Sequence, residues 1–122
     1  LAVMLTVVRN FRDKGGAMPA DEIRARLGLP TRIVNDVLFQ LVQAGQLIAV
    51  RSGDGERETA FTPAHDIASM TVYGVLEAVE RSGQPTFDLG QTPELARVDR
   101  ELEMLKDSAR QSQENVRLTE LL

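Results

Sequence analysis

Apolar residues recur at helical spacing at the start of the chain, which predicts a helix over residues 1–13. The apolar stripe of this helix consists of Leu1, Met4, Leu5, Val7, Val8 and Phe11. Acidic residues after Pro19 and a Gly-Leu-Pro break predict two further helices, over residues 20–27 and 31–44. Gly45 follows the third helix, as is common at helix C-termini.

A β-hairpin is predicted directly after the third helix. Two short apolar runs cover residues 47–50 and 59–62. The tip between them contains Gly53, Asp54 and Gly55. This tip lacks the Lys and the Ser or Thr of a phosphate-binding loop, and it does not open a helix. We therefore interpret it as an ordinary hairpin turn.

The rest of the chain predicts two more helices. The first covers about residues 72–81, with Thr71 as its N-terminal cap. The second covers about residues 93–117, and its Thr-Pro-Glu start is favourable for a capped helix.

This order of elements is typical of a winged helix-turn-helix. The predicted class is mainly α with a small β-hairpin and an extra C-terminal helix. We expect a winged-helix domain over residues 1–82, a linker over residues 83–91 and an amphipathic helix over residues 92–122.

Composition excludes several kinds of chemistry. The 122 residues suffice for one domain, and they include no Cys and one His. Without Cys there can be no disulfide, thiolate zinc site or Cys nucleophile. His65 stands beside Asp66, but adjacent side chains seldom face each other, and no nucleophile has a defined place near them. We expect no enzyme, no cofactor and no metal site.

Charge is unevenly distributed along the chain. The net charge is −4, which disfavours a nucleic-acid partner. Residues 1–63 carry eight Lys and Arg against seven Asp and Glu, whereas residues 64–122 carry six against eleven. No run of apolar residues is long enough to span a bilayer. The chain begins at Leu1, from which we expect a piece of a longer protein or a processed one.

The third helix would be the recognition helix of a DNA-binding winged helix. Its predicted core face consists of Val34, Val37, Leu38 and Leu41. Its predicted interaction face consists of Arg32, Asn35, Asp36, Phe39 and Gln43. An acid repels phosphate, and a phenyl ring has no groove partner except a thymine methyl, so we favour a protein partner over DNA. If DNA is bound, the expected contacts are Thr31, Arg32, Asn35, Gln43 and Arg51.

Apolar residues of the last helix follow the alternating spacing of a coiled-coil seam. The seam consists of Leu95, Val98, Leu102 and Leu105, and it continues more weakly through Ala109, Ser112 and Val116. Two fates remain open for it: packing on the chain's own first helix, which we favour, or pairing with a second copy of the chain. We expect the C-terminal tail to pack on the domain through Leu118, Leu121 and Leu122.

Segments 29–35, 41–47 and 61–72 resemble the C-terminal soluble domain of YihY/BrkB-type inner-membrane proteins, formerly called ribonuclease BN-like. The resemblance covers roughly residues 17–90. It implies an upstream membrane domain, a location at the cytoplasmic face of the inner membrane, and no catalytic residue in this chain. The first hypothesis is therefore a non-catalytic module that acts through protein contacts, with a partner, with its own membrane domain or with itself.

The chain also resembles Rrf2-type transcription regulators. These have a winged helix, a segment like residues 67–80 and a long C-terminal dimer helix. The cysteines that bind an iron–sulfur cluster in that family are missing. The alternative hypothesis is a dimeric DNA-binding regulator without a cluster.

Overall fold

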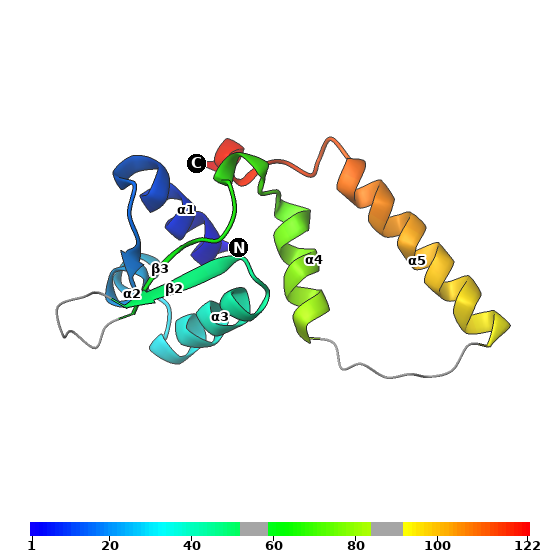
Figure 1. Cartoon of the computed structure of the whole chain (residues 1–122), viewed down its shortest axis with the longest axis horizontal. Helices are drawn as coiled ribbons and strands as arrows, with labels where there is room; N and C mark the ends of the chain where they lie inside the picture. The colour runs from blue at the N-terminus through cyan, green and yellow to red at the C-terminus, as the bar shows by residue number, and fades with distance from the viewer. Residues whose placement is uncertain (52–58, 84–91) are drawn as a thin grey trace.

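The computed structural model describes residues 1–51, 59–83 and 92–122 (Figure 1). The mainly helical class with a small antiparallel sheet is confirmed. The hairpin tip and most of the predicted linker lie outside the described residues. The elements, in chain order, are α1 (Ala2–Lys14), β1 (Met18–Pro19), α2 (Ala20–Leu27), α3 (Thr31–Gln43), β2 (Leu47–Arg51), β3 (Thr59–Pro63), the 3-10 helix η1 (Ile67–Ser69), α4 (Val72–Gly83), α5 (Pro93–Gln111) and the 3-10 helix η2 (Leu118–Leu121).

Glycines in the left-handed conformation end the first two helices. Gly15 has a φ of 72°, and its N–H donates to the carbonyl oxygen of Phe11 at 2.8 Å. Gly28 has a φ of 63° and donates in the same way to Arg24 at 3.0 Å. Residues with a Cβ are strained at such φ values, so these glycines stop the helices. The three predicted N-terminal helices accordingly match the observed bounds to within one or two residues.

The sheet has the strand order β1-β3-β2, and both strand pairs are antiparallel. The central strand places Phe61 opposite Met18 of β1 and opposite Ala49 of β2. Strand β1 was not predicted, because two residues are too few for an alternating pattern. It exists because β3 supplies its hydrogen-bonding partner.

The apolar core lies between the first three helices, the sheet and the C-terminal tail. Its largest fully buried side chains are Met4, Val7, Val8, Met18, Ile23, Val34 and Leu118. The buried face of α1 is rotated from the predicted stripe. Val3 is buried, whereas Leu1 and Phe11 are partly exposed. The two ends of the predicted stripe therefore stay outside the core, because the sheet and η2 cover a neighbouring side of α1.

The last helix is shorter than predicted, since α5 ends at Gln111 and not near residue 117. The chain after it runs back along the segment before α4. The N–H of Val72 donates to the carbonyl oxygen of Val116 at 3.0 Å, and the N–H of Leu118 donates to that of Met70 at 2.9 Å. This pairing uses backbone groups that a longer helix would need. Burial of Leu118 in the core adds to the preference for the shorter helix.

Truncation of Leu118 should destabilise the fold strongly. Its side chain is fully buried, so Leu118→Ala is expected to lower the free energy of unfolding by about 2–5 kcal/mol. Urea titration followed by far-UV circular dichroism measures this, since the chain has no Trp for fluorescence. Leu121→Ala is the matched control, because Leu121 is half exposed and its loss should cost less than about 1 kcal/mol. Equal costs for the two variants would contradict the docked tail.

Candidate functional site

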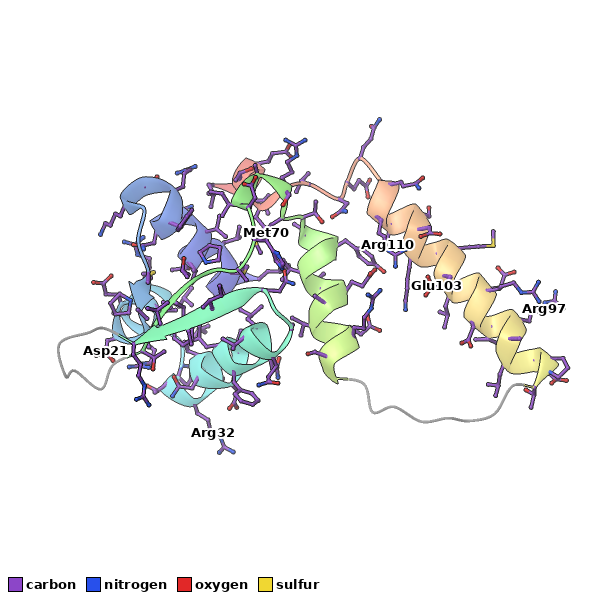
Figure 2. The ribbon with its side chains drawn as sticks, viewed as in Figure 1. Asp21, Arg32, Met70, Arg97, Glu103 and Arg110 are labelled. Atoms are coloured by element: carbon purple, nitrogen blue, oxygen red, sulfur yellow. The ribbon has the colours of Figure 1, made fainter. Side chains whose placement is uncertain are left out.

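The outer face of α3 is exposed along the length of the helix. The residues predicted to contact a partner all lie on it: Arg32, Asn35, Asp36, Phe39 and Gln43. Phe39 is 66% exposed, although it is the largest apolar side chain of the helix. Figure 2 shows Arg32 pointing away from the body of the protein. On the opposite face Val34, Leu38 and Leu41 are buried, whereas Val37 is only half-buried.

An arginine of α2 fixes the orientation of a side chain on this face. Arg24 donates from Nη1 to Oδ1 of Asn35, at a distance of 3.1 Å. The same guanidinium forms an ion pair with Asp21 of α2. We call these three residues the α2–α3 brace. Sequence reasoning missed the role of Arg24, because no local pattern links two residues eleven positions apart.

A hollow of about 430 Å³ lies beside the brace, between α2, α3 and the sheet. Arg24, Asn35 and Phe39 line its polar and aromatic side. Its remaining lining is largely apolar and comes from Ala20, Leu38, Val42, Ala49, Thr59 and Phe61. The hollow therefore places apolar surface directly beside the outer face of α3.

Arginines from three elements supply positive charge around α3. Arg26 lies in α2, Arg32 in α3 and Arg51 at the end of β2, and all three are exposed. Within the described residues none of them forms an ion pair. Thr31, the last of the expected DNA contacts, is exposed at the first position of α3.

The acidic surplus of the chain lies away from this face. Residues 64–122 hold eleven of the eighteen Asp and Glu, and α5 carries five of them. Figure 1 shows α5 beyond α4, at the far end of the molecule from α2. The outer face of α3 itself carries Arg32 and Asp36 and is close to neutral, so the net charge of −4 does not describe it.

The seam of α5 is exposed. Leu95, Val98, Leu102 and Leu105 have exposed fractions of 37%, 54%, 47% and 67%, and no described residue of α5 is buried. Helix α5 packs on α4 and not on α1, so the expectation that the seam covers the first helix is wrong. The reason is that η2 already occupies the neighbouring surface of α1 and ties the end of α5 to the start of α4.

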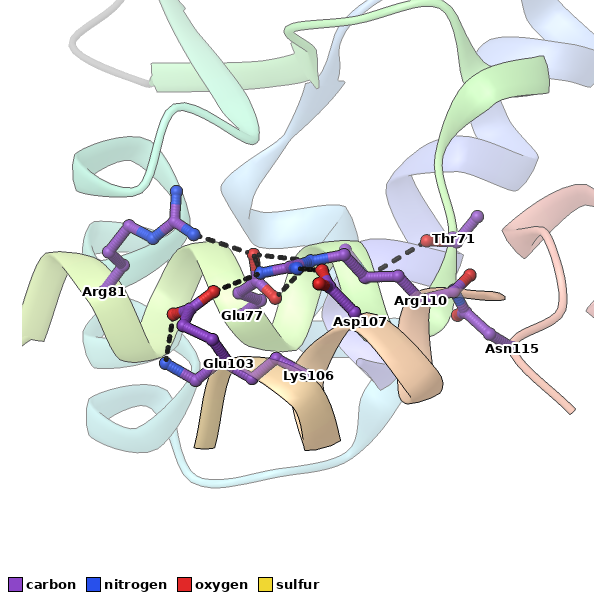
Figure 3. A network of polar contacts seen from close by, with 9 residues as sticks. Thr71, Glu77, Arg81, Glu103, Lys106, Asp107, Arg110 and Asn115 are labelled. Atoms are coloured by element: carbon purple, nitrogen blue, oxygen red, sulfur yellow. Dashed lines mark hydrogen bonds and ion pairs between the residues drawn. The ribbon is translucent and has the colours of Figure 1, made fainter. Parts of the chain in front are cut away.

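A charged network joins α5 to α4 (Figure 3). Glu77 of α4 accepts from Arg110 Nη2 at 3.0 Å and from Arg110 Nε at 3.1 Å. Arg81 also donates to Glu77, at 2.9 Å, and Asp107 pairs with the other side of Arg110. The hydrogen bonds from Arg110 hold the pKa of Glu77 below its ordinary value, although partial burial opposes this shift. The same hydrogen bonds raise the pKa of Arg110.

His65 and Asp66 lie directly before η1. The carboxylate of Asp66 accepts from the N–H of Ala68 at 3.0 Å and so caps η1. Among the described residues, no group of three or more potential ligands could hold a metal ion. No described helix has the length and hydrophobicity needed to cross a membrane.

No protein-family model and no curated protein matches this sequence. Solved structures of similar fold include the following three. CymR, the global cysteine regulator of B. subtilis, has a TM-score of 0.62 and 14% identity, covering 98% of this chain and 87% of its own. A Listeria innocua protein assigned as a transcriptional regulator has a TM-score of 0.60 and 13% identity, covering 98% and 78%. IscR of T. potens has a TM-score of 0.54 and 14% identity, covering 86% and 69%.

These similarities establish the winged-helix fold of the chain. CymR and the Listeria innocua protein are named as regulators, and at 13–14% identity their similarity to this chain shows the fold alone. Nothing in the comparisons supports a YihY/BrkB-type origin. An iron–sulfur cluster of the kind bound through cysteines does not fit this chain, because the sequence has no Cys.

Neutralising Glu77 should remove a pH-dependent part of the stability. Because the folded-state pKa of Glu77 lies below its ordinary value of 4.5, its contribution is present above pH 4.5 and is lost as the pH falls through the folded-state value. Urea titrations at neutral pH and at a pH below 4.5 compare the wild type with Glu77→Gln. The free energy of unfolding should fall less on acidification in the variant than in the wild type. Glu80→Gln, an exposed change on the same helix, should keep the wild-type profile.

Proposed function

We propose that this chain is a non-enzymatic transcription regulator that binds duplex DNA as a homodimer. The observation that carries the proposal is the outer face of α3, which no described segment covers. A winged helix places this helix in the major groove, where exposed polar side chains contact base edges and phosphates. Thr31, Arg32, Asn35 and Gln43 supply such side chains, and Arg51 ends the strand that leads into the wing. A regulator of this kind acts where the DNA lies, so its place is the cytoplasm.

The exposed seam of α5 supports the dimer. Four large apolar side chains at coiled-coil spacing remain in contact with solvent in a single chain, and a helix with the same seam on a second copy would cover them. A two-fold dimer uses the same patch on both subunits, so one seam suffices. The dimer also presents two copies of α3 to two half-sites of a DNA duplex.

Charge sets the expected strength of DNA binding. Arg26, Arg32 and Arg51 form no ion pair within the described part of the chain, so a dimer brings six such arginines. If all six neutralise phosphates, the slope of log affinity against log salt is about −5. A gel shift with random duplex DNA should therefore show binding at low salt that fades steeply as salt is added. No shift at low salt would contradict the proposal.

Removing Arg32 should weaken DNA binding without affecting the fold. Its side chain points into solvent, so Arg32→Ala should cost about 1–3 kcal/mol of binding free energy per half-site. Gel-shift titrations of the wild type and the variant on one duplex measure this loss. Arg9→Ala is the control with the same charge change, because Arg9 is an exposed residue of α1. If both variants bind as the wild type does, α3 is not the DNA-contacting helix.

A charge in the seam should separate the subunits. Leu102→Asp would bury an unpaired carboxylate in a seam-to-seam dimer, so the variant should run at the 13.4 kDa mass of one chain. Light scattering should give the wild type a mass twice that of one chain. Met104→Asp is the control, because Met104 is 66% exposed and lies on the opposite side of α5. A wild-type monomer, or a Leu102→Asp dimer, would overturn this part of the proposal.

A further inference from the structure

The middle of α3 places a side-chain amide next to an aromatic ring. Asn35 and Phe39 are one helical turn apart, so their side chains are neighbours on the surface of the helix. Both line the hollow between α2 and α3, and the ring of Phe39 is 66% exposed. A polar donor or acceptor and an apolar surface thus face solvent together.

The α2–α3 brace decides which end of the Asn35 amide faces outward. The guanidinium of Arg24 has only hydrogen-bond donors, so the atom of Asn35 that it contacts must be the oxygen Oδ1. The ion pair with Asp21 holds the guanidinium in place. The Nδ2 group of Asn35 therefore points away from Arg24. In the described part of the chain it donates to no acceptor.

Only one base edge in the major groove combines an acceptor with an apolar group. Thymine offers O4 as an acceptor and a 5-methyl group beside it. Guanine offers two acceptors without a methyl, and cytosine offers a donor. Adenine offers the acceptor N7 beside the N6 donor and carries no methyl group, so it gives the ring of Phe39 no apolar partner.

We propose that Asn35 and Phe39 together read a thymine in each half-site of the DNA. Nδ2 of Asn35 donates to O4, and the ring of Phe39 packs against the 5-methyl group. This inference rests on the proposed DNA-binding function and assigns a base preference to its site. Phe39, which argued against DNA when only the sequence was considered, becomes a specificity-determining residue beside an oriented amide.

The test removes only the methyl group. Duplexes that bind the full-length chain are selected from a random library, and each thymine of the selected site is replaced in turn by deoxyuridine. At one thymine in each half-site the replacement should weaken binding about fourfold, or about fifteenfold when both half-sites are changed, as expected for losing contact with one methyl group per site. Gel-shift titrations give the affinities.

Protein variants show which side chain senses the methyl. Phe39→Ala should bind the thymine and deoxyuridine duplexes equally, whereas Ile33→Ala should keep the penalty, because Ile33 is a half-exposed residue on another side of α3. Asn35→Asp exchanges the outward donor for an acceptor and should shift the preference of selected sites from thymine towards cytosine. Circular dichroism checks that these exposed changes leave the fold intact.

The outcomes separate this inference from the function on which it rests. If no duplex is bound at low salt, the proposed function fails. If DNA is bound but Phe39→Ala shows the same deoxyuridine penalty as the wild type, the thymine contact is overturned while DNA binding stands. Selected sites without a preferred thymine at the base pair that Asn35 contacts would overturn it as well. So would a Phe39→Ala variant that binds DNA normally but loses a protein partner.

Discussion

The return of the C-terminal tail to the core is the contact on which the arrangement of the helices depends. Leu118 is fully buried, and its N–H donates to the carbonyl oxygen of Met70. Asn115 accepts from the N–H of Tyr73 at 2.8 Å and so adds a side-chain tie beside this backbone pairing. Because the tail follows α5 directly, these contacts bring the C-terminal end of α5 to the start of α4. The burial of Leu118 thereby fixes the position of the C-terminal end of the 19-residue helix α5 next to the core.

Helix α5 is held at one end and exposed along the rest. The pair of Glu77 and Arg110 joins its last turns to α4, and Figure 1 shows the two helices diverging towards Pro93. The seam therefore faces solvent in a single chain, with Leu105 67% exposed. Arg110 is about a third exposed, and solvent screening at such a site leaves the pair with a modest contribution to stability by itself. Its importance here is geometric, since it orients the helix on which the proposed dimer depends.

The two surfaces that matter for the proposed function lie in different parts of the molecule. Helix α3 and its neighbouring arginines belong to a half of the chain that is nearly neutral, whereas α5 belongs to the acidic half. This separation explains why a chain with a net charge of −4 can still present a DNA-binding face. It also explains why the total charge of the chain disfavoured a nucleic-acid partner.

The sequence by itself determined the elements whose signals are local. Gly15 and Gly28 end helices because of their own backbone freedom, Thr92 caps α5 through a neighbouring N–H, and the seam of α5 follows from spacing alone. The outward face of α3 followed in the same way from helical periodicity. Only the tertiary structure decided the two-residue strand β1, the end of α5, the exposure of its seam and the contact of Arg24 with Asn35. Each of these depends on partners distant in the chain, whose meeting is set by burial of the whole core and by no local pattern.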